Sequence, residues 1–245
     1  QLRQLSKLVA ELSDSTYGFL SHGGNSAGAY LAGAIPHRGP GGADIGEFGD
    51  NLETMFSQGK KALVLLKTEL GKDSVKQEMA MDFASNADFV VSISSFADDE
   101  AFAYADVILP IAGYLESAGS YVNANGVWQD FNASVNAPGQ AKPAWKVLRV
   151  LGNLLNLKNF DHVSSQDIMQ EVKGRMGAVG DKVKSRWNCP DQLATEGVRP
   201  DPVCMYQTDV YVRRATALQE TALAQNEEDL KRPQLSPFHN IIGGV

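Results

Sequence analysis

The sequence is poor in cysteine. Only two of its 245 residues are cysteines, Cys189 and Cys204. They lie too far apart in sequence to form the C-x-x-C pairs of zinc or iron–sulfur sites. We expect both to be free thiols, as is usual in a reducing compartment. The chain therefore offers no cysteine framework for a metal or cluster of its own.

Excess basic charge and long apolar runs are also lacking. Acidic residues outnumber basic ones by 29 to 22, which gives a net charge of -7. Without a Lys/Arg cluster, binding to nucleic acid through phosphates is disfavoured. No apolar run approaches the roughly 20 residues that a membrane-spanning helix needs, so we expect no direct membrane insertion. The sequence begins at Gln1 without a signal-peptide pattern, and we interpret it as a fragment of a longer protein.

The first half of the chain alternates strand and helix patterns. Short apolar runs predict strands at 17–20, 61–66, 88–94 and 106–109. Helical periodicity and capping signals predict helices at 1–13, 25–33, 51–58, 73–85 and 98–104. Strands that are apolar throughout and alternate with helices are typical of a buried parallel sheet. We therefore predict an α/β fold with a partial Rossmann-like parallel sheet and flanking helices.

The second half is less regular. Glycines punctuate residues 111–140, which predicts loops and short extended pieces. Pro143 then begins a helix with a strong apolar side. We place the α/β domain at 1–157, with its upstream part missing, and a helical and irregular C-terminal extension at 158–245. Further helices are predicted there at 165–176 and 209–231.

One short stretch, SHGGNSAGAY at 21–30, allows three interpretations. The letters G-N-S-A-G fit a nucleophile elbow with Ser26 as the nucleophile, and the preceding His22-Gly23-Gly24 would be an oxyanion loop. A hydrolase would also need a downstream base, for which His162 and His239 are available. Alternatively, Gly23, Gly24 and Gly28 could receive a phosphate at a helix N-terminus. We favour a strand-to-helix turn with small residues for close packing, capped by Asn25 or Ser26.

Other candidate ligands are isolated from one another. The four histidines, His22, His37, His162 and His239, form no cluster with each other or with cysteine. Glu116 is a lone acid in a glycine-rich loop, and we expect it to cap the loop or to face solvent. Metal binding therefore has little support.

A longer motif occupies residues 105–129, which read ADVILPIAGYLESAGSYVNANGVWQ. It resembles the signature of molybdopterin oxidoreductases, A-D-V-[IV]-L-P followed by E-x-x-G-[TS]-x-x-N-x-E-G-R-x-Q. The matching residues are Ala105, Asp106, Val107, Leu109, Pro110, Glu116, Gly119, Ser120, Asn123, Gly126 and Gln129. The stretches PGQA at 138–141 and WKVL at 145–148, and N-S-A-G-A with Ile35-Pro36, resemble further family motifs.

One departure concerns cofactor binding. The family's E-G-R is Asn125-Gly126-Val127 here, so an acid and an arginine are missing. Arginine suits bidentate contacts with phosphate, and valine cannot make them. We therefore expect no molybdopterin in this chain and assign no catalytic, cofactor-binding or metal-ligating residue. The alternative is a fragment of a true molybdenum enzyme similar to formate dehydrogenases, with Glu116, Gly119 and Asn123 near a pterin dinucleotide.

Within the family, three segments resemble the branch found in respiratory complex I. They are PHRGPGGADIGE, PAWKVLRVLGNLL and YQTDVYVRRATALQET. This resemblance implies iron–sulfur clusters in a missing N-terminal region and a packing role for the present chain. It also implies an oxidoreductase that passes electrons from NADH to quinone, with other peripheral-arm subunits as partners. The implied location is the cytoplasmic side of the bacterial inner membrane.

Overall fold

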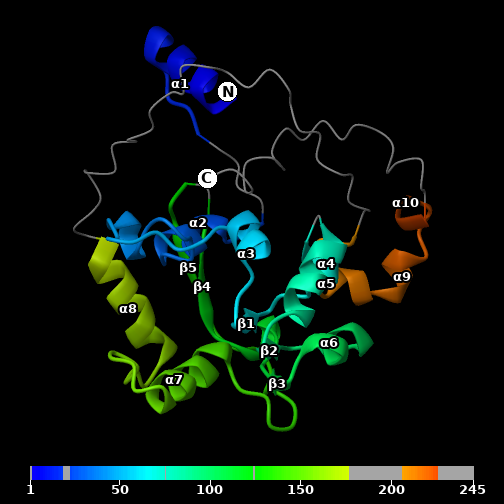
Figure 1. The fold of residues 1–245 in the computed structure, drawn as a ribbon. Coiled ribbons are helices and arrows are strands. Elements are labelled where there is room, and N and C mark those ends of the chain that lie inside the picture. Colours follow the sequence, from blue (N-terminus) through cyan, green and yellow to red (C-terminus); the bar gives the residue numbers. More distant parts are fainter. Residues whose placement is uncertain (1, 19–22, 75, 124, 177–205, 226–245) are drawn as a thin grey trace. The chain divides into compact units, whose positions relative to one another are not determined.

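The computed structural model describes residues 2–18, 23–74, 76–123, 125–176 and 206–225 (Figure 1). The chain divides into two compact units. The first comprises Gln1–Gly49, Ala112–Pro138 and Pro143–Gly197, and the second comprises Asp50–Ile111, Gly139–Lys142 and Val198–Val245. The chain thus passes from one unit to the other several times. The domain boundary at 157/158 was drawn from the sequence patterns, and it stays a prediction.

A parallel sheet forms the centre of the second unit. Its strands are β1 (Ala62–Leu66), β2 (Phe89–Ser94) and β3 (Val107–Pro110), in the order β1-β2-β3. This confirms the predicted α/β class and three of the predicted strands. The strand predicted at 17–20 is wrong for Tyr17 and Gly18, which are irregular. Residues 19 and 20 lie outside the described part of the chain.

The helices of this unit alternate with the strands, and their first residues differ from the predicted ones. They are α3 (Leu52–Gln58), α4 (Leu70–Asp73), α5 (Gln77–Ser85) and α6 (Asp99–Tyr104). The cap of α3 is Asn51, whose Oδ1 accepts from the Thr54 amide at 2.9 Å. The preceding Asp50 pairs with Lys60. The single helix predicted over 73–85 is interrupted between α4 and α5.

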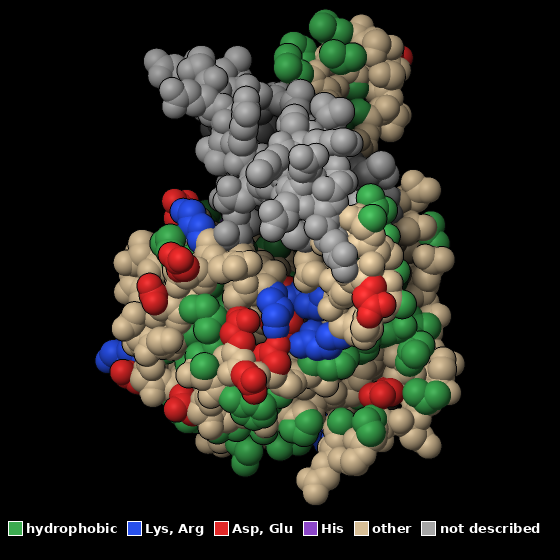
Figure 2. Space-filling model, turned by 90° about the vertical axis from the view of Figure 1, so that its right-hand side faces the viewer, with side chains coloured by type: hydrophobic (Ala, Val, Ile, Leu, Met, Phe, Trp, Pro, Cys, Tyr) green, Lys and Arg blue, Asp and Glu red, His purple; other side chains and the backbone are tan. Residues whose placement is uncertain are grey.

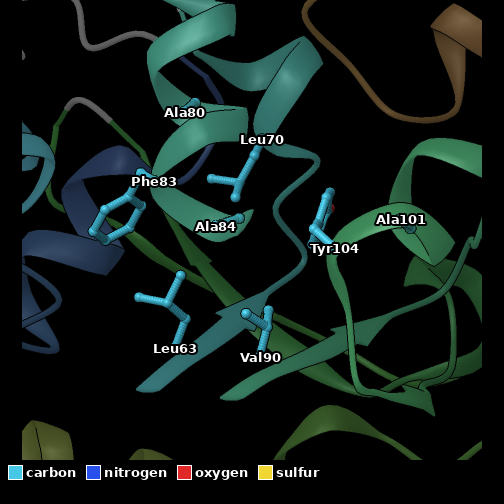
Figure 3. Close-up of a cluster of buried hydrophobic side chains, with 8 residues drawn as sticks. All are labelled: Leu63, Leu70, Ala80, Phe83, Ala84, Val90, Ala101 and Tyr104. Atoms are coloured by element: carbon cyan, nitrogen blue, oxygen red, sulfur yellow. The ribbon is translucent and has the colours of Figure 1, made fainter. Parts of the chain in front are cut away.

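The hydrophobic core of this unit covers one face of the sheet (Figure 3). Leu63 and Val90, which pair in register on neighbouring strands, point toward the helices. The helices contribute Leu70, Ala80, Phe83, Ala84, Ala101 and Tyr104. On the opposite face, Val64 and Phe89 are 56% and 46% exposed. The predicted burial of the sheet is therefore found on the face toward the helices and at Ile93 of the opposite face, which is 0% exposed, but not at Val64 and Phe89.

The first unit combines helices with a β-hairpin. Its helices are α1 (Leu2–Ser13), α2 (Ser26–Leu31), α7 (Ala144–Leu154) and α8 (Ser165–Met176). Short 3-10 turns lie at Pro40–Gly42 (η1) and Tyr114–Glu116 (η2). The antiparallel hairpin consists of β4 (Gly119–Val122) and β5 (Trp128–Phe131). These elements confirm the predicted helices at 1–13 and 165–176 and the helix that follows Pro143.

The described end of the chain, residues 206–225, belongs to the second unit. It forms three short turns, η3 (Val212–Arg214), α9 (Thr216–Gln219) and α10 (Ala222–Gln225). The continuous helix predicted from residue 209 is therefore wrong as far as residue 225, and its end lies outside the described residues. Cys189 and Cys204 lie outside them as well.

Candidate functional site

The turn at residues 23–31 is hydrogen-bonded to the β4–β5 hairpin of the same unit. Asn25 occupies the N-cap position of α2, but its side chain makes no capping hydrogen bond. Instead, its Oδ1 accepts from the backbone amide of Val122 in β4 at 2.8 Å. Val122 is only 1% exposed, so this amide has little access to water. Asn25 therefore supplies the acceptor for a buried strand amide.

The glycines of this turn allow close packing. A Cβ atom on Gly28 would lie 2.1 Å from Asn25 Oδ1, so any larger residue would displace the Asn25 side chain. A Cβ atom on Gly24 would lie 3.8 Å from the ring of Tyr121, which is ordinary contact. Gly23 has a positive φ of 75°, a conformation that glycine adopts without strain. The close packing expected for this turn is therefore found. The expected cap is not, because the Asn25 side chain bonds β4 and does not cap α2.

The nucleophile hypothesis requires a base near Ser26, the first residue of α2. Of the two candidate bases, His162 lies with its Nε2 2.5 Å from Glu171 Oε2, and its carbonyl accepts from Arg149. His162 is thus engaged with α7 and α8. His22 and His239 lie outside the described residues.

Glu116 stabilises its own loop. Its Oε2 accepts from the Gly113 amide at 2.8 Å, and its amide donates to the Gly113 carbonyl at 3.2 Å. The neighbouring Leu115 carbonyl accepts from the amides of Ser134 and Val135. The expectation that Glu116 caps its loop is confirmed by the first of these bonds.

The β4–β5 hairpin uses three further motif residues. Asn123 Oδ1 accepts from the amides of Asn125 and Val127, both at 3.0 Å. Gly126, with a φ of 77°, donates its amide to the Asn123 carbonyl at 2.9 Å. A Cβ atom on Gly119 would lie 2.8 Å from Phe131 Cζ, which fills the space beside it. The hairpin therefore depends on these residues for its shape.

Asp106, the acid of the A-D-V-I-L-P motif, has an equivalent role in the second unit. Its Oδ2 accepts from the Val90 amide at 2.7 Å, and its own amide donates to the Val90 carbonyl at 2.9 Å. These bonds fix the start of β3 against β2. Asp106 thus helps to hold β3 in register with β2.

Two hollows are found among the described residues of the second unit. A hollow of about 490 Å³ is lined by residues that include Gly71, Glu78, Asp82 and Glu100, all in the second unit. A second hollow, of about 260 Å³, lies around Phe56 and Phe83. Among the described residues, no group of three or more His, Cys, Asp or Glu side chains could hold a metal ion. None of their helices is long and apolar enough to cross a membrane.

Comparison with known proteins gives the family. Residues 2–154 match the molybdopterin oxidoreductase family. The chain belongs to this family. The resemblance inferred from the motifs at 105–148 is therefore confirmed, as is the predicted α/β fold.

Relatives of two kinds are found in this molybdopterin oxidoreductase family. The G subunit of the NADH-quinone oxidoreductase of Rickettsia bellii is 28% identical over 193 residues, 75% of this chain and 26% of that protein. The mitochondrial 78 kDa subunit of NADH-ubiquinone oxidoreductase of Candida albicans is 37% identical over 111 residues, 45% of this chain and 14% of that protein. The catalytic subunit of assimilatory nitrate reductase of Bacillus subtilis is 32% identical over 114 residues, 46% of this chain and 16% of that protein. The chain thus spans about a quarter or less of the length of these curated relatives.

The geometry of this family member fits a pterin dinucleotide poorly. Glu116 and Asn123 use side-chain oxygens to hold their own loops. The space beside Gly119 is filled by Phe131, and Val127 stands where the family motif has arginine. Glu116 and Asn123 are therefore engaged in internal bonds, and the Val127 side chain offers no donor for a phosphate.

Sequence reasoning missed one group of side chains, an ionic cluster in the second unit. It joins Arg213 and Arg214 to Glu69 and to two aspartates. The adjacent arginines were the only local signal. Their acidic partners lie more than a hundred residues earlier, and no local pattern connects the two.

Proposed function

We propose that this chain is a scaffold portion of the G subunit of an NADH-quinone oxidoreductase. The observation that carries the proposal is Val127, which stands where the family motif has an arginine suited to phosphate. Asn25, Asp106, Glu116 and Asn123 all place their side-chain oxygens on backbone amides of the same unit. The similarity to the corresponding protein of Rickettsia bellii, over three quarters of this chain, supports the same proposal.

In this proposal the complete protein serves an enzyme that passes electrons from NADH through iron–sulfur clusters to quinone. The clusters belong to a cysteine-rich region upstream of the present residues, and this chain holds no molybdopterin. Its partners are other peripheral-arm subunits of the complex, on the cytoplasmic side of the bacterial inner membrane. The present residues support the cluster-bearing region by packing and take no part in electron transfer.

A true molybdenum enzyme is the second candidate. One observation favours it, the 32% identity to the catalytic subunit of a nitrate reductase. Elemental analysis of the full-length native protein separates the two. We expect iron without molybdenum or tungsten. Stoichiometric molybdenum or tungsten in the purified protein contradicts the scaffold proposal.

A pair of neighbouring substitutions tests the scaffold role itself. Asn25→Ala removes the bond to Val122, whereas Ser26→Ala removes the hydroxyl of the supposed nucleophile. In cells that express the full-length protein, we expect Asn25→Ala to lower the yield of assembled complex and Ser26→Ala to leave assembly and NADH oxidation unchanged. Loss of activity in Ser26→Ala with normal assembly would instead support the hydrolase hypothesis.

A further inference from the structure

In the second unit, the segment at residues 206–219 lies against the carboxyl ends of two strands. Arg213 contacts Glu69 Oε2 at 3.1 Å and Asp73 Oδ1 at 2.5 Å. Glu69 follows β1, and its Oε1 also accepts a hydrogen bond from the Arg214 guanidinium at 2.6 Å. Asp98, which follows β2, pairs with Lys72 and also lies 3.5 Å from Arg214. Figure 2 views the side that carries α9 and α10 and shows basic side chains lying between acidic ones.

Burial makes this cluster different from a surface ion pair. The side chains of Arg213 and Glu69 are only 4% and 8% exposed. Both Glu69 carboxylate oxygens accept from guanidinium groups. A buried carboxylate is strongly disfavoured unless it is paired and hydrogen-bonded, so Glu69 depends on the arginines. The planar guanidinium suits such multiple bonds better than an ammonium group does.

An aromatic contact adds specificity for arginine. The Arg214 guanidinium lies 4.5 Å from the centre of the Phe96 ring, a cation–π distance. Tyr211 packs edge-to-face on the same ring at 5.1 Å between centroids. Phe96 comes from the loop after β2, so this contact also lies at the carboxyl edge of the sheet.

The segment is held in a closed shape by its own bonds. Gln207 Nε2 donates to Gln219 Oε1 at 2.6 Å, and Gln219 Nε2 donates to the Val212 carbonyl at 3.0 Å. Asp209 Oδ1 accepts from the amides of Tyr211 and Val212, both at 2.9 Å. These bonds present the two adjacent arginines together to the acids.

The position of the segment has a consequence for ligand binding. Open parallel α/β sheets bind their ligands in the crevice outside the carboxyl ends of the strands. Here the chain itself covers that edge beside β1 and β2. We propose that Glu69, Asp73 and Asp98 form a recognition site for a paired-arginine segment, which the chain fills with its own residues 206–219 as a strap over the sheet edge. This inference does not depend on the proposed function.

Binding in trans tests the recognition site. The full chain with Arg213→Met and Arg214→Met keeps the acids but lacks their arginine partners. We expect a fluorescent peptide of residues 206–219 to bind this variant, and to bind the native chain at least about tenfold more weakly, because the native site is occupied. A peptide with both arginines replaced by methionine, and the variant with Glu69→Gln added, should show no binding. Equal binding to the native chain and the variant, or binding of the methionine peptide, overturns the proposal.

A measurement on milder variants applies even if the double substitution prevents folding. Arg214→Lys keeps the charge but loses the paired guanidinium bonds and the ring contact. We expect amide hydrogen exchange within 206–219 to accelerate about tenfold, while exchange in β1 and β2 stays unchanged. Arg175→Ala is the control, because Arg175 makes an exposed helical pair with Glu171 in the other unit. Unchanged exchange in 206–219 would refute the strap.

Discussion

Because of the bond between Asn25 and Val122, we expect Gly28→Ala to destabilise the native protein but to stabilise the Asn25→Ala variant. Asn25→Ala leaves the Val122 amide buried without its acceptor, which should destabilise the unit by about 1–3 kcal/mol. Gly28→Ala places a Cβ atom 2.1 Å from the original position of Asn25 Oδ1, so it should disrupt the same bond. Alanine, however, is a better helix former than glycine by about 1 kcal/mol, which offsets part of the loss.

The reversal appears when the two substitutions are combined. In the native background, Gly28→Ala should cost up to about 2 kcal/mol, the lost bond less the gain in helix propensity. In the Asn25→Ala background there is no bond left to lose, so Gly28→Ala should stabilise by up to about 1 kcal/mol. Urea unfolding followed by far-UV circular dichroism gives the four free energies of this cycle. If Gly28→Ala has the same effect in both backgrounds, the assigned role of Gly28 is incorrect.

Three further predictions concern single side chains. The hydrogen bond from Lys72 holds the pKa of Asp98 below its ordinary 3.8, aided by the Ala101 amide and the charges of Lys72 and Arg214. The ionised Asp98 therefore stabilises the fold above pH 3.8, and this contribution is lost as pH falls through the lower pKa of the folded state. In urea unfolding between pH 6 and pH 3, the free energy of unfolding should change less with pH for Asp98→Asn than for the native protein. Burial raises the pKa of Tyr104 above its ordinary 10.0, so stability should fall as pH rises past that value, and Tyr104→Phe should remove this alkaline loss in a pH-dependent unfolding series. Gly119→Ala should destabilise the hairpin by about 1–3 kcal/mol through overlap with Phe131, and adding Phe131→Leu should recover part of the loss in the same urea assay.

Local patterns predicted the elements whose causes are local. Three strands were found because each is a short apolar run, and α8 was found at 165–176 because its helical pattern is uninterrupted. The family resemblance also followed from residues close together in sequence. These predictions needed no knowledge of which segments meet in space.

The errors have long-range causes. Asp73 was interpreted as the start of a helix, but it ends α4, where its Oδ2 accepts from the Glu69 amide and its Oδ1 receives Arg213. Arg213 lies 140 residues further along the chain. Likewise, Asn25 looked like a helix cap, whereas its partner Val122 is 97 residues away. The role of a polar side chain with several possible partners can be assigned only when the fold shows which partner lies close.

The same reasoning limits what the family signature says about a cofactor. Asn25, Asp106, Glu116 and Asn123 each satisfy backbone amides that would otherwise lack an acceptor, so the fold requires them whether or not a pterin is bound. A match at these positions therefore indicates the fold and carries little information on ligand binding. Position 127 is different, because Val127 donates its backbone amide to Asn123 and the residue is half exposed. The bond at position 127 uses the backbone alone and does not depend on the side chain. Valine lacks the guanidinium that suits phosphate, and the scaffold proposal rests on this difference, not on the shared fold.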